Sequence, residues 1–181
     1  TDIWVRNEED GIDSHQNPEY DPVDPNYIYT RVTNKSCATS SGNDVLKLYW
    51  AKANTALLWD DHWDGSLIID GVVMGDEVGD IIIPVLAPGE EIVLSIPWLV
   101  PNPDDYLDND NPWHFCLLAR IESGQDPMTF PEVPFLPTNV SNNNNIAWKN
   151  LTIVDIDPLN PGFTGATVGI GNNDIVAKPF I

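Results

Sequence analysis

The side chains best suited to acid–base chemistry are three histidines, His15, His62 and His114, because imidazole titrates near neutral pH without any perturbation. His62 lies in the acidic and aromatic segment 59–65, Trp-Asp-Asp-His-Trp-Asp-Gly. A carboxylate–imidazole pair could form there, although a loop anchored by its aromatic side chains explains the same residues. The chain has no Gly-x-Ser-x-Gly motif, and no set of nucleophile, base and oxyanion donors can be assembled from it. We therefore predict that the protein is not an enzyme.

Three loops concentrate carboxylates, and calcium binds such groups together with nearby carbonyl oxygens, six to eight ligands in all. They contain Glu8, Glu9, Asp10 and Asp13; Asp60, Asp61 and Asp64; and Asp104, Asp105, Asp108 and Asp110. The third loop does not follow the EF-hand spacing, because the twelfth residue counted from Asp108 is Ala119 rather than Glu. We predict a calcium site at Asp104, Asp105, Asp108 and Asp110, with a solvated charge cluster as the alternative, and no other cofactor.

The two cysteines, Cys37 and Cys116, are an even number far apart in sequence, which suits one disulfide in an oxidising compartment. Two free thiols are the alternative. His114 and Cys116 would share one face of a strand, but no further His or Cys pair completes a zinc site. Strand parity places Cys116 on the face opposite to Phe115 and Leu117. If those two enter the core, a bridge from Cys116 leaves from the outer face of its sheet.

Seven tryptophans raise the question of sugar binding, because an exposed indole offers an apolar face with a polar edge. Five of them are expected on buried strands, namely Trp4, Trp50, Trp98, Trp113 and Trp148. Trp59 and Trp63 fall in a loop that could expose them. They are the predicted ligand-binding residues if the protein binds a glycan.

The overall amino-acid composition limits the classes of partner that the protein can bind. The chain has 181 residues, of which 28 are Asp or Glu and 8 are Lys or Arg, so its formal net charge is -20. Such a charge repels nucleic acid and anionic lipid, and no run approaches the ~20 apolar residues of a membrane span. We predict an extracellular or cell-surface location, where calcium or salt relieves the self-repulsion. The chain starts at Thr1, which we interpret as a processed or excised N-terminus.

Period-two patterns and frequent Gly, Pro, Asn and Asp predict a chain built of strands. The expected strands are Ile3–Arg6, Tyr27–Asn34, Val45–Ala51, Ile81–Val85, Glu90–Trp98, Trp113–Glu122 and Ile146–Ile156. The 16 prolines disfavour long helices, and we expect at most a helical turn at Ala53–Leu58. About seven strands predict an all-β, immunoglobulin-like antiparallel sandwich.

The C-terminal end differs from the rest. We assign residues 1–156 to the sandwich and residues 157–181 to an extension. Within it, Phe163–Ile181 is rich in Gly and apolar residues. We expect this extension to form an extra hairpin or a strand that pairs with a neighbouring subunit.

Several segments together resemble a known kind of module. They are Asp2-Ile3-Trp4-Val5-Arg6-Asn7, His15-Gln16-Asn17-Pro18, Tyr27-Ile28-Tyr29-Thr30-Arg31-Val32-Thr33-Asn34, Leu48-Tyr49-Trp50-Ala51-Lys52-Ala53, His114-Phe115-Cys116-Leu117-Leu118-Ala119-Arg120-Ile121 and Asn142–Asn145-Ile146-Ala147-Trp148-Lys149-Asn150. They look like the immunoglobulin-like modules of large secreted or surface proteins of bacteria, similar to the bacterial cell-adhesion-related domain (CARDB). The resemblance covers roughly residues 2–156 and implies a fold and a surface context. It supplies no catalytic site.

Two functions follow as hypotheses. In the first, the chain is a non-catalytic extracellular structural or adhesive module, a subunit of a surface filament in which the terminal strand of one copy completes the sheet of the next. Its partners would be copies of itself or a larger parent assembly. In the second, it is a carbohydrate-binding module appended to a secreted enzyme, with a glycan as its partner.

Overall fold

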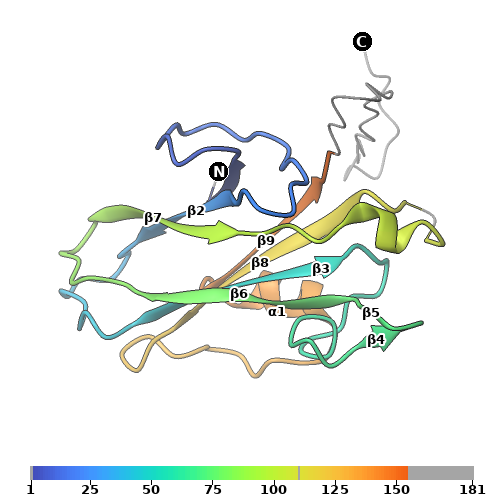
Figure 1. Ribbon diagram of the computed structural model, residues 1–181. Helices are drawn as coiled ribbons and strands as arrows, with labels where there is room; N and C mark the ends of the chain where they lie inside the picture. The colour runs from blue at the N-terminus through green and yellow to red at the C-terminus, as the bar shows by residue number, and fades with distance from the viewer. Residues whose placement is uncertain (1, 110, 155–181) are drawn as a thin grey trace, which may run out of the picture.

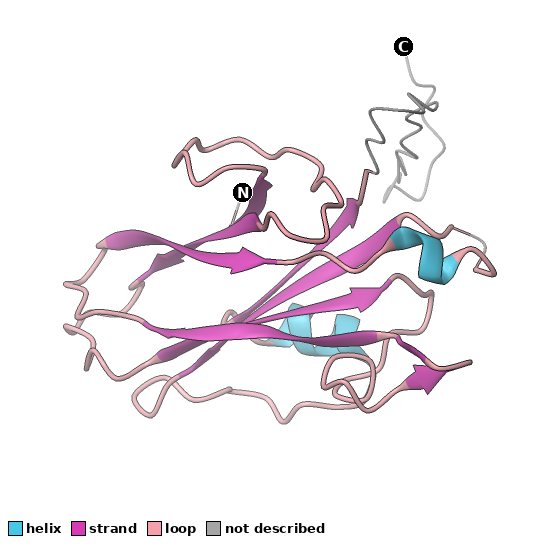
Figure 2. Ribbon diagram, in the orientation of Figure 1, coloured by secondary structure: helices cyan, strands magenta, loops and turns pink. Residues whose placement is uncertain are grey.

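The computed structural model describes residues 2–109 and 111–154, which form two antiparallel sheets stacked face to face (Figure 1). The strands of this part are β1 (Ile3–Arg6), β2 (Asn26–Thr33), β3 (Val45–Lys52), β4 (Ile68–Ile69), β5 (Val72–Val73), β6 (Gly75–Ile82), β7 (Glu91–Trp98), β8 (His114–Glu122) and β9 (Ile146–Thr152). The helical segments are the 3-10 helix η1 (Pro103–Tyr106) and the short helix α1 (Leu136–Asn142), both visible in Figure 2. None of the described helices has the length and apolarity to cross a membrane.

The sheets have the orders β1-β2-β7 and β6-β3-β8-β9, and β4 and β5 form a separate hairpin. All strand pairs within them are antiparallel. The predicted immunoglobulin-like sandwich is therefore confirmed. Its sheets contain three and four strands, and β6 belongs to the larger sheet because it pairs with β3. In a constant-type immunoglobulin domain, the corresponding strand instead lies beside strand E, in the sheet that also contains strands A and B.

The inner core fills the space between the two sheets. Alternate residues of each strand point into it, which is why Ile28 and Val32 of β2 meet Phe115 and Leu117 of β8 in one buried cluster. Phe115 and Leu117 are 0% exposed. At one end of the sandwich the ring of Tyr106 packs edge-on against Phe115.

An outer core covers the other face of the four-stranded sheet. It consists of Tyr49, Ala51, Leu57, Trp63, Cys116, Leu118, Leu136 and Ile146. Helix α1 and the loop that follows β3 supply its cover, as Leu136 and Trp63 show by being 0% exposed. A strand buried on both faces reads as a continuous apolar run rather than an alternating one. This explains the sequence Phe-Cys-Leu-Leu-Ala of β8.

The outer face of the three-stranded sheet is covered by the connection between β1 and β2, which arches over that layer in Figure 1. Arg6, 8% exposed, donates from Nη2 to Asp10 at 2.7 Å and from Nη1 to the hydroxyl of Ser14 at 3.2 Å. Trp4 stacks on Tyr29 with ring centroids 5.6 Å apart. The acidic first loop therefore serves to hold arginine side chains against this sheet.

Three expectations differ from the structure. β6 begins at Gly75, six residues before the predicted Ile81, because its exposed face carries Asp76, Glu77 and Asp80 and reads as a turn. Ala53–Leu58 contains a turn and no helix. Helix α1 was not predicted, since its Pro and Asn content is typical of loops, although Pro is tolerated in the first helical turn. The predicted extension 157–181 lies outside the described residues.

Lys52, at the end of β3, is a buried cation with 3% exposure. Its Nζ donates to the carbonyl oxygens of Asn111 and His114 at 2.6 and 2.7 Å and lies 5.0 Å from the ring centroid of Phe115. Burial lowers the pKa of this amine to about 8. The carbonyls satisfy its protons, but they do not neutralise its charge.

We expect the stability of the protein to rise with pH through the titration of Lys52. The folded amine has its pKa below the unfolded value of 10.5, so between these values unfolding takes up a proton. The free energy of unfolding should gain about 1 kcal/mol from pH ~7.5 to pH ~9. Urea unfolding of the native chain and of Lys52→Met at both pH values measures this gain. An equal slope in the two proteins would contradict the assignment to Lys52.

Candidate docking groove

A groove of about 610 Å³ opens between the two sheets beside the end of β2. We call it the docking groove and define its floor by Thr30, Val32, Leu46, Leu86, Ile121 and Ala147. These residues come from both sheets and from the loop between β6 and β7, so the groove is a gap in the sandwich interior that the described residues do not fill. Asp2 lies at its border.

The groove exists because β1 is shorter than the strand beside it. β1 pairs with Tyr27–Thr30, and the carbonyl of Asp2 accepts one further bond from the N–H of Arg31 at 2.9 Å. In an antiparallel pair, alternate residues turn their main-chain groups to opposite sides. The N–H of Asn34 donates to the carbonyl of Glu90, just before β7 begins. The even-numbered residues of β2 therefore turn their main-chain N–H and C=O groups toward β7. Thr33 therefore turns its N–H and C=O toward the side where β1 has ended, and no described strand pairs with it there.

One polar atom on the groove floor lacks a partner. Thr30 is 4% exposed, and its hydroxyl makes no hydrogen bond to the described residues. It shares the inward parity of Ile28 and Val32. A buried hydroxyl without a partner costs about 1–3 kcal/mol, a cost that a polar group entering the groove would remove.

Comparison with known proteins finds a likeness only among solved structures. No family model matches the chain, and no curated protein matches it. Among solved structures, the chain is similar to the CARDB domain of a Pyrococcus furiosus protein in complex with di-metal ions, with 12% sequence identity and a TM-score of 0.42. The likeness covers 84% of this chain and 86% of that one. This neighbour bears the name of the cell-adhesion-related domain that the sequence resembles.

The described part of the chain shows no cluster of metal-ligating side chains. No three His, Cys, Asp or Glu side chains converge in residues 2–109 and 111–154. Asp104, Asp105 and Asp108 are exposed, and Asp110 lies outside the described residues. Asn102 caps η1 by accepting from the N–H of Asp104 at 3.1 Å. The predicted calcium site at Asp104, Asp105, Asp108 and Asp110 therefore has no assembled counterpart among the three residues that are described.

The other acidic loops make local bonds. Asp13 pairs with Arg31, and Asp64 accepts from the N–H of Ser66 at 2.9 Å. His62 makes no ion pair with a described carboxylate, and its Nδ1 accepts from the N–H of Leu58 at 3.3 Å. His15 uses its Nδ1 for the N–H of Val5 at 3.1 Å. These groups fasten loops to the sandwich.

The predicted Cys37–Cys116 disulfide is wrong for this structure, in which both thiols are free. Cys37 is exposed in the loop between β2 and β3. Cys116 is 1% exposed in the outer core, and its thiol donates to Asn150 at 3.0 Å. The parity argument is confirmed, because Cys116 faces away from the inner core. Helix α1 and the loop that follows β3 nevertheless bury it, which raises the pKa of its thiol to about 11.

The predicted sugar platform is also not assembled. Trp63 is 0% exposed, so its predicted exposure is wrong. Trp59 is half-buried, with the guanidinium of Arg120 4.3 Å from its ring centroid and the ring of Tyr49 edge-on to it. Both indoles hold the loop after β3 against the outer core and have no free face in common.

The docking groove was missed from sequence. The available signal was a mismatch in strand length, four residues in Ile3–Arg6 against eight in the predicted Tyr27–Asn34. A strand that outruns its neighbour leaves main-chain groups without partners. The mismatch alone does not reveal that the unpaired stretch borders a cavity between the two sheets.

Proposed function

We propose that the protein is a non-catalytic extracellular structural or adhesive module that takes up an extended segment of another chain in its docking groove, as a subunit of a surface filament. The observation that carries this proposal is the apolar groove floor beside the main-chain groups of Thr33, with which no described strand pairs on the β1 side. In strand addition, main-chain bonds supply affinity and pockets for alternate side chains supply selectivity.

The other sheet edges carry features that oppose strand addition. β6 has Asp76, Glu77 and Asp80 and a register shift opposite Leu48 and Tyr49. β7 has Pro97, whose nitrogen cannot donate. Charges, bulges and prolines are common ways to block an edge.

The two remaining edges are partly covered. Gln16 donates to the carbonyl of Val5 on the outer side of β1 at 2.9 Å. On β9, Lys149 has the inward parity of Ala147 and Leu151, and burial lowers its pKa. An inward charge on an edge strand also discourages pairing. The stretch of β2 at the docking groove therefore combines an open edge with a cavity whose floor is largely apolar and whose border is polar.

Thr33→Pro tests the open edge, because it removes an N–H that bonds to no described strand. We expect it to weaken self-association by about tenfold, the equivalent of one lost main-chain bond. Val93→Pro is the matched control, since Val93 on β7 also turns its N–H outward but lies at a different edge. Sedimentation velocity of the full chain measures both. Equal association of Thr33→Pro and Val93→Pro would refute the groove as an acceptor.

A further inference from the structure

We infer that the segment entering the docking groove is Ala166–Gly171 of a second copy of this chain, an inference that rests on the proposed function above. Ala166, Val168 and Ile170 alternate with Thr167, Gly169 and Gly171. In an extended strand, the first three residues share one face. That face offers small apolar side chains to the floor of Val32, Leu86 and Ala147.

Charge favours this segment. The chain carries a net charge of -20, yet it has no Asp, Glu, Lys or Arg between Pro158 and Asn173. Two acidic subunits repel each other over a Debye length of about 8 Å at physiological salt. A segment without charged side chains approaches the groove of another copy without adding to that repulsion.

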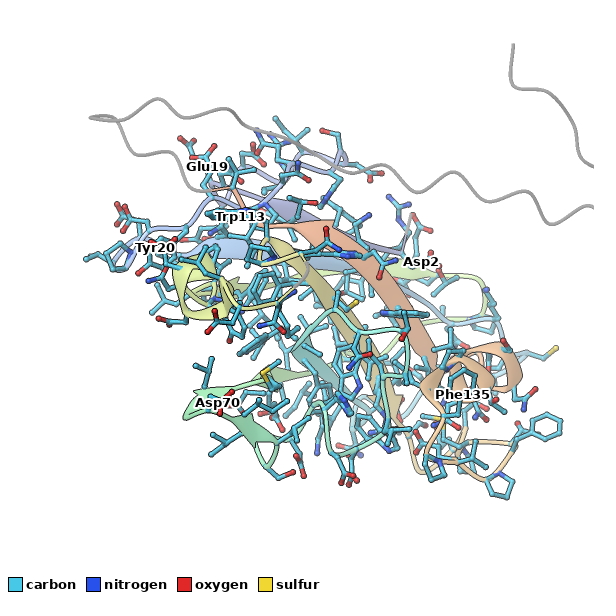
Figure 3. The ribbon with its side chains drawn as sticks, turned by 90° about the vertical axis from the view of Figure 1, so that its right-hand side faces the viewer. Asp2, Glu19, Tyr20, Asp70, Trp113 and Phe135 are labelled. Carbon is cyan, nitrogen blue, oxygen red and sulfur yellow. The ribbon has the colours of Figure 1, made fainter. Side chains whose placement is uncertain are left out.

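The end of the described chain and the groove lie at opposite ends of β9. The described chain ends at Val154, whose N–H and C=O bond to Pro18 and Tyr20. Figure 3 shows Glu19, Tyr20 and Trp113 near one another, well away from Asp2, which borders the groove. β9 separates the two places, because Ile146 lines the groove and Thr152 lies at the far end of the strand. Seven residues of strand span about 23 Å.

Direction favours a second copy over the same one. A segment returning from Val154 to its own groove would have to pass the His15–Tyr20 stretch, which bonds to both Val5 and Val154. It would then enter parallel to β2. A segment from a second copy can enter from the open end near Thr33 and run antiparallel to β2, in the direction of β1. Antiparallel pairing is the more stable arrangement per residue. Each copy would thus accept a segment of another copy at one end of the sandwich and donate its own segment from the other end.

The first experiment compares two acidic substitutions of equal charge in the full chain. Val168→Asp places a carboxylate on the inward face and Thr167→Asp places one on the outward face. We expect Val168→Asp to weaken self-association at least about tenfold, because an unpaired carboxylate resists burial. Thr167→Asp should match the native chain. Equal association of the two variants, with Thr33→Pro still defective, would overturn this donor and leave the proposed function intact.

The second experiment mixes Val168→Asp with Thr33→Pro. The Val168→Asp chain keeps an intact groove, and the Thr33→Pro chain keeps an intact segment. The mixture should therefore yield heterodimers that do not grow into longer assemblies. If the native chain self-associates and neither variant differs from it, both the inference and the proposed function fail.

If the native chain is monomeric in solution, a crosslinking experiment tests the inference. Exposed Cys37 lies between Ser36 and Ala38, which line the groove. Thr164→Cys provides a second thiol, and oxidation by diamide joins neighbouring thiols. A crosslink between differently tagged copies supports the inference. A crosslink within one chain, or no crosslink, overturns it.

Discussion

Replacing Trp63 by alanine is expected to lower the free energy of unfolding by about 4 kcal/mol, which corresponds to roughly 10 °C in Tm for a domain of this size. The indole is 0% exposed and packs among Leu57, Cys116 and Leu136 in the outer core. Alanine would leave a cavity between the four-stranded sheet and the loop after β3. Thermal unfolding followed by near-ultraviolet circular dichroism measures the loss.

Two controls separate packing from other effects of the same residue type. Trp63→Phe keeps most of the volume and removes an indole N–H that has no hydrogen-bond partner among the described residues, so it should cost less than about 1.5 kcal/mol. Trp148→Ala removes an indole that is 36% exposed and should cost still less. A Trp63→Ala protein as stable as Trp148→Ala would show that the outer core does not form as described.

Adding a single methyl group at Gly75 is expected to destabilise the protein by about 3 kcal/mol or more. A Cβ built there would lie 2.0 Å from the carbonyl oxygen of His62 and 2.7 Å from that of Trp50. Both are main-chain atoms, so no side-chain rotation relieves the overlap. Gly75 also accepts from the N–H of Gly65 at 3.0 Å. The substitution should therefore release the loop that carries Trp63 from the sheet.

Gly124→Ala is the matched control, because a Cβ at Gly124 meets nothing within 4 Å. Its Tm should stay within a few degrees of the native value. Limited proteolysis would locate the damage in Gly75→Ala, with new cleavage expected in the segment 57–65. Cleavage elsewhere, or an unchanged Tm, would mean that the close approach of the loop to Gly75 is not required for the fold.

The strands that could be predicted were those with one or both faces apolar. Ile3–Arg6 matches β1, and Glu90–Trp98 differs from β7 by one residue. β6 was largely missed because an edge strand with one acidic, exposed face gives a weak alternation signal. Helix α1 was missed because its two buried residues, Leu136 and Asn139, draw their burial from tertiary contacts that no local pattern encodes.

Predictions about sites met a different obstacle. A cluster of carboxylates in sequence specifies neither what each one contacts nor where its oxygens point, and Asp10 and Asp13 turned out to hold arginines. Cys116 could be placed on the correct face by parity, but its burial depends on a cover contributed by Leu136 and Trp63, far from it in sequence. The docking groove depends on where one strand stops relative to another, which is a property of the register.

The burial of β8 on both faces implies that some parts of the molecule unfold more easily than others. Its residues Phe115–Arg120 are all buried, and the strand is bonded to β3 on one side and β9 on the other. Its amides should exchange with solvent only when the whole domain unfolds. On the other sheet, β1 pairs with β2 through only four residues. It can therefore detach as a smaller cooperative unit. A pull applied through the N-terminus would meet that weaker unit first, leaving the four-stranded sheet intact while the other sheet yields.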